Sequence, residues 1–193
     1  YTGYQLFQNR WEKKYKKPLG EGCPKMNSDL DQTVYMLGML SGLQAMTNDI
    51  NSGGAINVPK DIAGIVERGM TCLDNEKFWG APMATRAVIW TLLPGAGDGK
   101  PEPYATMKES MQIGEKKGVR LSHALYAVAA QASGDDAKLR DELRTHADKS
   151  VLLTTKTTKT FDPNGVYKIY GTYTKKLAEM QSYAYLAVAR AET

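Results

Sequence analysis

Cysteine and histidine, which supply much of the nucleophilic and metal chemistry of proteins, are scarce in this sequence. Its 193 residues include two cysteines and two histidines. Cys23 and Cys72 do not form a CxxC pair, and His123 and His146 lie far from them without metal-ligand spacing. We therefore expect no metal site and no cofactor.

Catalytic signatures are missing as well. There is no HExxH, GxSxG, Walker loop or EF-hand loop. The glycines of PGAGDGKPEP, residues 94–103, lack the spacing of a dinucleotide-binding turn. A cysteine nucleophile with His123 as its base is the enzymatic alternative, but a histidine beside an apolar helix face is more often structural. We expect no catalytic residue and a protein that is not an enzyme.

Long apolar runs and a strong charge of one sign are also absent. The longest apolar stretch, Val34 to Met46, is interrupted by small and polar residues and is too short to span a membrane. The 25 basic and 21 acidic residues give a net charge of +4, which is too mild to indicate a nucleic-acid partner. A basic run, Lys13, Lys14, Lys16 and Lys17, leaves a contact with an anionic surface open.

Helical periodicity is present almost throughout, which predicts an all-α fold: a multi-helix bundle of antiparallel helical hairpins. Ser28 is the expected N-cap of the longest helix. Residues 151–173 can form either a short β-hairpin around DPNG or a helix followed by a loop. The expected helices cover residues 5–15, 29–51, 60–73, 82–93, 104–117, 121–132, 135–149 and 174–190.

Length predicts one domain over residues 1–193. Within it, the Gly/Pro-rich segment 95–103 is expected to join two subassemblies, residues 1–94 and 104–193. Because the chain opens at Tyr1 and not at Met, we expect a mature or trimmed form.

The two cysteines can be buried thiols or one disulfide. We expect the disulfide Cys23–Cys72, which would indicate an oxidising compartment.

Adaptable apolar side chains are abundant, with nine methionines, eleven tyrosines and three tryptophans. Met fills irregular gaps and lines permissive pockets, while Tyr and Trp join an apolar body to a polar tip. In the helix 29–51, Gly38, Ser41, Gly42 and Ala45 form a face with almost no side chains, which a neighbouring helix or a flat ligand can approach. Ordinary core packing also explains this composition. The candidate ligand-binding residues are Tyr35, Met39, Leu43, Met46, Phe78, Trp79, Met83, Trp90 and Tyr126.

The runs DQTVYMLGMLSGLQA, CLDNEKFWGAPMATRAVIWTLLPG and LSHALYAVAAQASGDD resemble the all-helical periplasmic proteins related to the T component associated with TRAP transporters, which include helical sterol-transport proteins of bacteria. The resemblance implies a periplasmic, non-enzymatic protein with a tetratricopeptide-like arrangement, although no 34-residue repeat is visible. It also implies a hydrophobic ligand such as a sterol or another lipid. We therefore expect a carrier that holds this ligand in an apolar cavity between helices, with a helical scaffold for a periplasmic transport protein as the alternative.

Overall fold

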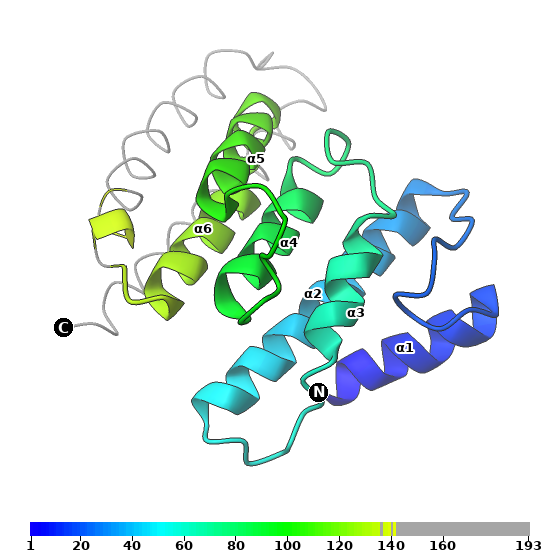
Figure 1. Cartoon of the computed structure of the whole chain (residues 1–193). Coiled ribbons are helices and arrows are strands. Elements are labelled where there is room, and N and C mark those ends of the chain that lie inside the picture. The colour runs from blue at the N-terminus through cyan, green and yellow to red at the C-terminus, as the bar shows by residue number, and fades with distance from the viewer. Residues whose placement is uncertain (136, 140, 142–193) are drawn as a thin grey trace, which may run out of the picture. The chain divides into compact units, whose positions relative to one another are not determined.

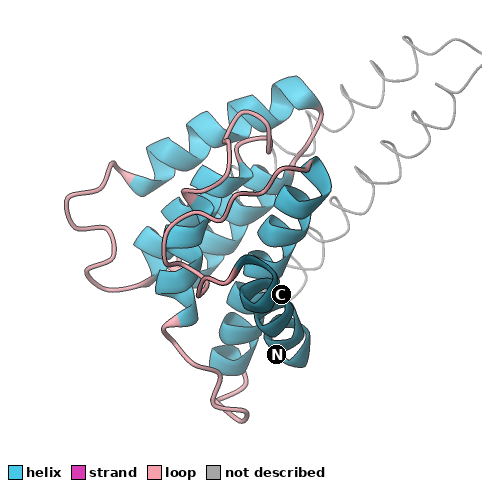
Figure 2. Cartoon of the chain, turned by 90° about the vertical axis from the view of Figure 1, so that its right-hand side faces the viewer, coloured by secondary structure: helices cyan, strands magenta, loops and turns pink. Residues whose placement is uncertain are grey.

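The computed structural model describes residues 1–135, 137–139 and 141, and in this part the chain forms helices and no strand (Figures 1 and 2). The predicted all-α class is confirmed there. The possible hairpin near 151–173 and the helix expected over 174–190 lie outside the described residues, as does nearly all of 135–149. The helices are α1 Thr2–Tyr15, α2 Asp29–Asn51, α3 Ile62–Met70, α4 Ala81–Leu92, α5 Pro103–Lys117 and α6 Leu121–Ala132.

Local sequence signals explain where several helices begin and end. Ser28 caps α2 as predicted, because its side-chain oxygen accepts a hydrogen bond from the Asp31 backbone N–H at 3.1 Å. Helix α5 ends at Gly118, which adopts the left-handed conformation with φ 75°. Helix α3 is shorter than expected, because the chain after Met70 tightens into turns in which the Thr71 and Cys72 N–H groups bond three residues back.

The chain divides into two compact units, which we call unit 1 (Tyr1–Phe78) and unit 2 (from Trp79 onward). This division differs from the predicted one, which placed the boundary at residues 95–103. That segment belongs to unit 2, where successive turns fold it back: the Ala96, Asp98 and Lys100 N–H groups each bond to the carbonyl three residues earlier. Ala96 packs against the core around Trp90, so a Gly/Pro-rich composition here marks a packed turn and not a linker.

The predicted disulfide is confirmed and lies in unit 1. Cys23 and Cys72 are joined, with their Cα atoms 5.2 Å apart. The bridge ties the loop between α1 and α2 to the end of α3. Beside it, Arg68 Nε donates a hydrogen bond to the Gly20 carbonyl at 3.1 Å, so the same loop is held to α3 at a second point.

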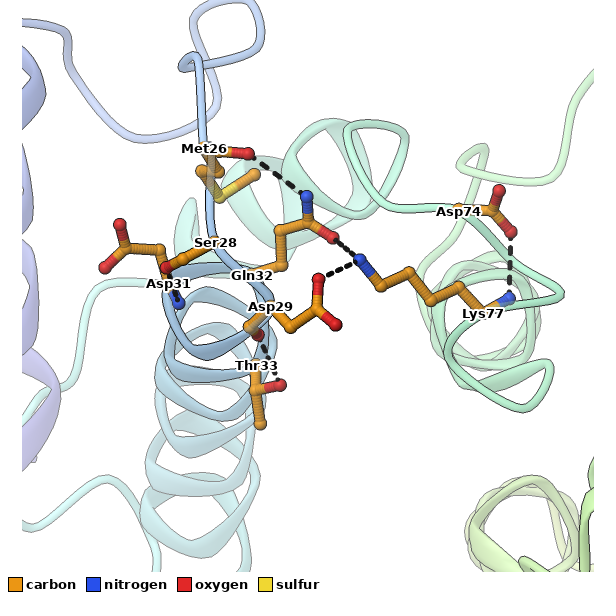
Figure 3. Close-up of polar contacts among 8 residues, drawn as sticks. All are labelled: Met26, Ser28, Asp29, Asp31, Gln32, Thr33, Asp74 and Lys77. Atoms are coloured by element: carbon orange, nitrogen blue, oxygen red, sulfur yellow. Dashed lines mark hydrogen bonds and ion pairs between the residues drawn. The ribbon is translucent and has the colours of Figure 1, made fainter.

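Polar contacts hold the last residues of unit 1 to the start of α2 (Figure 3). Lys77 Nζ donates to Asp29 Oδ1 and to Gln32 Oε1, both at 2.7 Å. Gln32 Nε2 in turn donates to the Met26 carbonyl at 3.1 Å. Since Lys77 directly precedes Phe78, these bonds fasten the end of unit 1 to the first turn of α2.

Helices α4, α5 and α6 pack on one another in unit 2. The close approach of α5 to the start of α4 requires glycine: Gly80 has φ +79°, and a Cβ there would overlap the backbone carbonyl of Ser110. In the part of the chain that the structure describes, no helix combines the length and apolarity that crossing a membrane requires.

Candidate functional site

The small-residue face of α2 is covered by aromatic rings of α1. A Cβ added at Gly38 would lie 2.5 Å from the Phe7 ring, and one at Gly42 would lie 2.5 Å from the Tyr4 ring. Both rings therefore rest on the α2 backbone. Of the two occupants left open for this face, a helix or a flat ligand, the structure contains the helix.

The rings of α1 and α2 form a continuous aromatic row: Tyr4, Phe7, Trp11 and Tyr15 of α1 with Tyr35 of α2. Neighbouring ring centroids along α1 are 6.3, 5.5 and 4.6 Å apart. The Tyr35 ring lies 5.3 Å from that of Trp11. These separations suit tilted and edge-to-face aromatic contacts, so the row is a single packed surface.

Three polar tips of the aromatic row are buried without a hydrogen-bond partner in the described part of the chain: Tyr4 Oη, Trp11 Nε1 and Tyr35 Oη. The side chains that carry them are 2%, 5% and 1% exposed. A buried donor without a partner costs about 1–3 kcal/mol, so three of them in one aromatic surface need an explanation. A bound ligand with an acceptor oxygen would explain them, because the oxygen would accept a hydrogen bond from these donors.

Tyr35 Oη points toward α3. A Cβ at Gly69 would lie 2.8 Å from Tyr35 Oη and 2.6 Å from Met39 Cε. Tyr35 and Met39 therefore meet at the same glycine, with a donor and a polarizable thioether side by side. Of the predicted site residues, Tyr35 thus belongs to the aromatic row, and Met39 lies beside its hydroxyl group.

Burial raises the pKa of Tyr35 to about 12. It does the same for the pKa of Tyr4, where Asp61 and then Glu12 add to the effect of burial. Both hydroxyls thus remain protonated donors across the physiological pH range. Tyr15 differs, since its Oη donates to Asp31 Oδ2 at 2.8 Å.

The raised pKa of Tyr35 predicts a loss of stability in alkali. The pKa of Tyr35 in the folded protein lies above the unfolded value of 10. The contribution of the neutral Tyr35 hydroxyl to the free energy of unfolding is therefore intact below pH 10 and is lost as the pH rises from 10 to 12. Over that window wild type is expected to lose about 2–3 kcal/mol more than Tyr35→Phe in urea unfolding. Parallel curves for the two proteins would show that the hydroxyl ionises as it does in the unfolded chain.

The nine predicted site residues are divided between the units and do not form one site within either. Leu43, Met46 and Phe78 are buried in unit 1 with Tyr35 and Met39. In unit 2, Trp90 and Tyr126 belong to one core cluster with Met107 and Met111 of α5, and the partly buried Met83 packs against it. Trp79 begins unit 2 with a positive φ of 58° and is half-buried. Met83, Trp90 and Tyr126 thus lie in or against a packed core.

Unit 2 also contains a buried polar cluster that sequence reasoning did not assemble. His123 Nε2 lies 2.9 Å from Glu115 Oε1 and 3.2 Å from Arg120 Nη1. His123 and Arg120 are 0% and 2% exposed. The chain reverses at Gly118, which brings the last turn of α5 beside the first turn of α6. This glycine was the feature of the sequence from which the cluster could have been predicted. The cluster agrees with a structural role for His123.

The enzymatic alternative required a free thiol. Both cysteines of the sequence are in the disulfide, so neither offers a thiolate in this state. In the described residues no three His, Cys, Asp or Glu side chains are grouped to hold a metal ion.

Comparison with known proteins gives no match: no family model, no curated protein sequence and no solved structure is significantly similar to the chain.

Proposed function

We propose that this chain is a non-enzymatic carrier of a hydrophobic ligand that bears one polar oxygen, a sterol or another lipid, bound at the aromatic row of unit 1. The observation that carries the proposal is the set of three buried donors without partners, Tyr4 Oη, Trp11 Nε1 and Tyr35 Oη. The apolar body of the ligand packs on the rings, at about 25 cal/mol per Å² of apolar surface buried. Its oxygen accepts a hydrogen bond from one or more of the donors.

Entry of the ligand requires α1 to lift from α2. The C-terminal end of α1 is held by polar bonds: Lys14 and Tyr15 bind Asp31, and Glu12 accepts from the Leu19 N–H at 3.1 Å. In the N-terminal half, the Tyr4 and Phe7 rings rest on α2 through packing contacts. We infer that α1 opens at its N-terminal end and exposes the glycine face of α2 to the ligand.

The disulfide supports residence in an oxidising compartment, and we assign the carrier to the periplasm. Native mass spectrometry of the purified protein with lipid extracts tests the function directly. A copurifying or added lipid that binds with one-to-one stoichiometry supports the carrier. If neither sterol nor phospholipid binds, the alternative function, a scaffold for a periplasmic transport protein, replaces it.

Replacing Tyr35 with phenylalanine separates ligand binding from stability. In the ligand-free protein, Tyr35→Phe is expected to leave the free energy of unfolding unchanged or raise it by up to about 1 kcal/mol, because it removes an unpartnered buried hydroxyl. Binding of the fluorescent sterol dehydroergosterol, measured by energy transfer from tryptophan, is expected to weaken about tenfold because one donor is lost.

Tyr15→Phe is the matched control. Its hydroxyl already donates to Asp31, so this change is expected to lower the free energy of unfolding by about 1 kcal/mol and leave the sterol affinity as in wild type. Wild-type sterol affinity in Tyr35→Phe, together with a lower free energy of unfolding, would contradict the site.

A further inference from the structure

Helix α2 exposes large apolar side chains on the side away from α3. Leu30, Val34 and Leu37 are 71%, 42% and 55% exposed and follow one another at helical spacings of four and three residues. Tyr35 and Met39, which face α3, lie on the opposite side of the helix. We call Leu30, Val34 and Leu37 the apolar stripe.

Charged groups are absent from the middle of α2. The helix has three charged residues, and none interrupts the stripe: Asp29 pairs with Lys77, Asp31 pairs with Lys14, and Asp49 is buried and accepts from the Ile56 and Val58 N–H groups. From residue 32 to residue 48 no side chain carries a charge. A solvent-facing helix normally carries charges on its outer face, so an outer face of large apolar side chains without them is unusual.

Helix α1 adds cations along the same side of unit 1. Glu12 lies on the side of α1 that faces α3. It accepts a hydrogen bond from the Leu19 N–H, and the next residue, Gly20, lies against Ile65 of α3. Leu6, Arg10 and Lys14 recur every four residues on the other flank, and Leu6 is 65% exposed. Arg10 and Lys13, both exposed, form what we call the cationic edge of the stripe, while Lys14 beside them is paired with Asp31.

We propose that the apolar stripe of α2 and the cationic edge of α1 together dock unit 1 on the surface of an anionic phospholipid bilayer. Apolar side chains enter the interface while adjacent Arg and Lys side chains meet lipid phosphates, which is the combination that holds interfacial helices on membranes. The charge of the edge selects an anionic surface. Docking does not require the ligand site, so the membrane-docking proposal can be tested separately from the carrier function.

The test uses the full chain with its disulfide intact and two kinds of vesicle, pure phosphatidylcholine and phosphatidylcholine mixed with phosphatidylglycerol. The protein is expected to sediment with the mixed vesicles and stay in solution with the pure ones. Raising the salt concentration should weaken the binding, since contacts between exposed charges are screened. Tyr35→Phe is expected to bind the vesicles as wild type does.

Two double variants separate the contributions of the apolar stripe and of the cationic edge to vesicle binding. Val34→Ser with Leu37→Ser, and separately Arg10→Gln with Lys13→Gln, are each expected to lower the partition coefficient about tenfold. Ile56→Ser and Lys60→Gln are the matched controls, because both residues are exposed and lie between α2 and α3, beyond the C-terminal end of the helix that carries the stripe. The controls are expected to bind as wild type does.

The variant Leu37→Cys measures directly whether the apolar stripe is accessible to a reagent in solution. A maleimide is expected to label it in the free protein and to be excluded on mixed vesicles. Absence of labelling in the free protein would overturn the proposal, because the rest of the chain would then cover the stripe. A protein-concentration-dependent protection without vesicles would also overturn it, in favour of a second copy of the chain. Equal binding to both kinds of vesicle would remove the role of the cationic edge and so reject the proposal.

Discussion

Replacing both cysteines with serine is expected to lower the free energy of unfolding of unit 1 by about 4 kcal/mol. The bridge joins residues 49 positions apart, and on the chain-entropy argument a loop of that length loses about this much conformational freedom in the unfolded state. The expected readout is a lower urea midpoint together with faster hydrogen exchange in peptides from α2 and α3.

The native fold itself should persist in this double variant. Arg68 still binds the Gly20 carbonyl, and Lys77 still binds Asp29 and Gln32. Peptides from α5 and α6 serve as the internal control, because unit 2 contains no cysteine. A loss below about 1 kcal/mol would mean that the loop is already restricted in the unfolded chain.

Gly80→Ala is expected to destabilise unit 2 by about 3 kcal/mol or more. Two costs combine at this position. The left-handed backbone, φ +79°, disfavours any residue with a Cβ by about 1–2 kcal/mol. The added methyl group would also overlap the Ser110 carbonyl, which is backbone of α5 and cannot rotate away.

Gly99→Ala isolates the conformational cost. Gly99 has φ +68°, but a Cβ there would meet no atom within 4 Å. Its substitution is expected to cost only this conformational part, about 1–2 kcal/mol, in thermal or urea unfolding. Equal losses for Gly80→Ala and Gly99→Ala would show that α5 shifts freely to accommodate the methyl group, contrary to the close packing described above.

Local signals were sufficient to predict much of the fold. The bounds of α2 and α6 could be predicted because their end signals are local: Ser28 before the first turn of α2, and glycines after both helices. The interpretation of residues 95–103 as a linker was wrong for a tertiary reason. Gly and Pro specify turns, but whether a run of turns packs depends on contacts such as that of Ala96 with the core around Trp90, which composition does not contain.

The candidate site was only half predicted. Tyr35 and Met39 were expected to bind the ligand, whereas Tyr4 and Trp11 were not among the candidates. The signal was available: aromatic residues recur on α1 at spacings of three and four, and two glycines recur on α2 at a spacing of four. The pairing of these faces is a tertiary contact, however, and no local pattern specifies which face of the second helix the first helix covers.

The disulfide has a topological consequence for unit 1. Every residue of α2 lies between Cys23 and Cys72, so the bridge closes a covalent ring that contains the whole helix. The exposed turn at residues 52–57 is part of that ring. If a protease cuts the chain once within this turn, the two pieces stay joined through sulfur, and α1 and α2 part from the rest of the protein only when the bridge is also reduced.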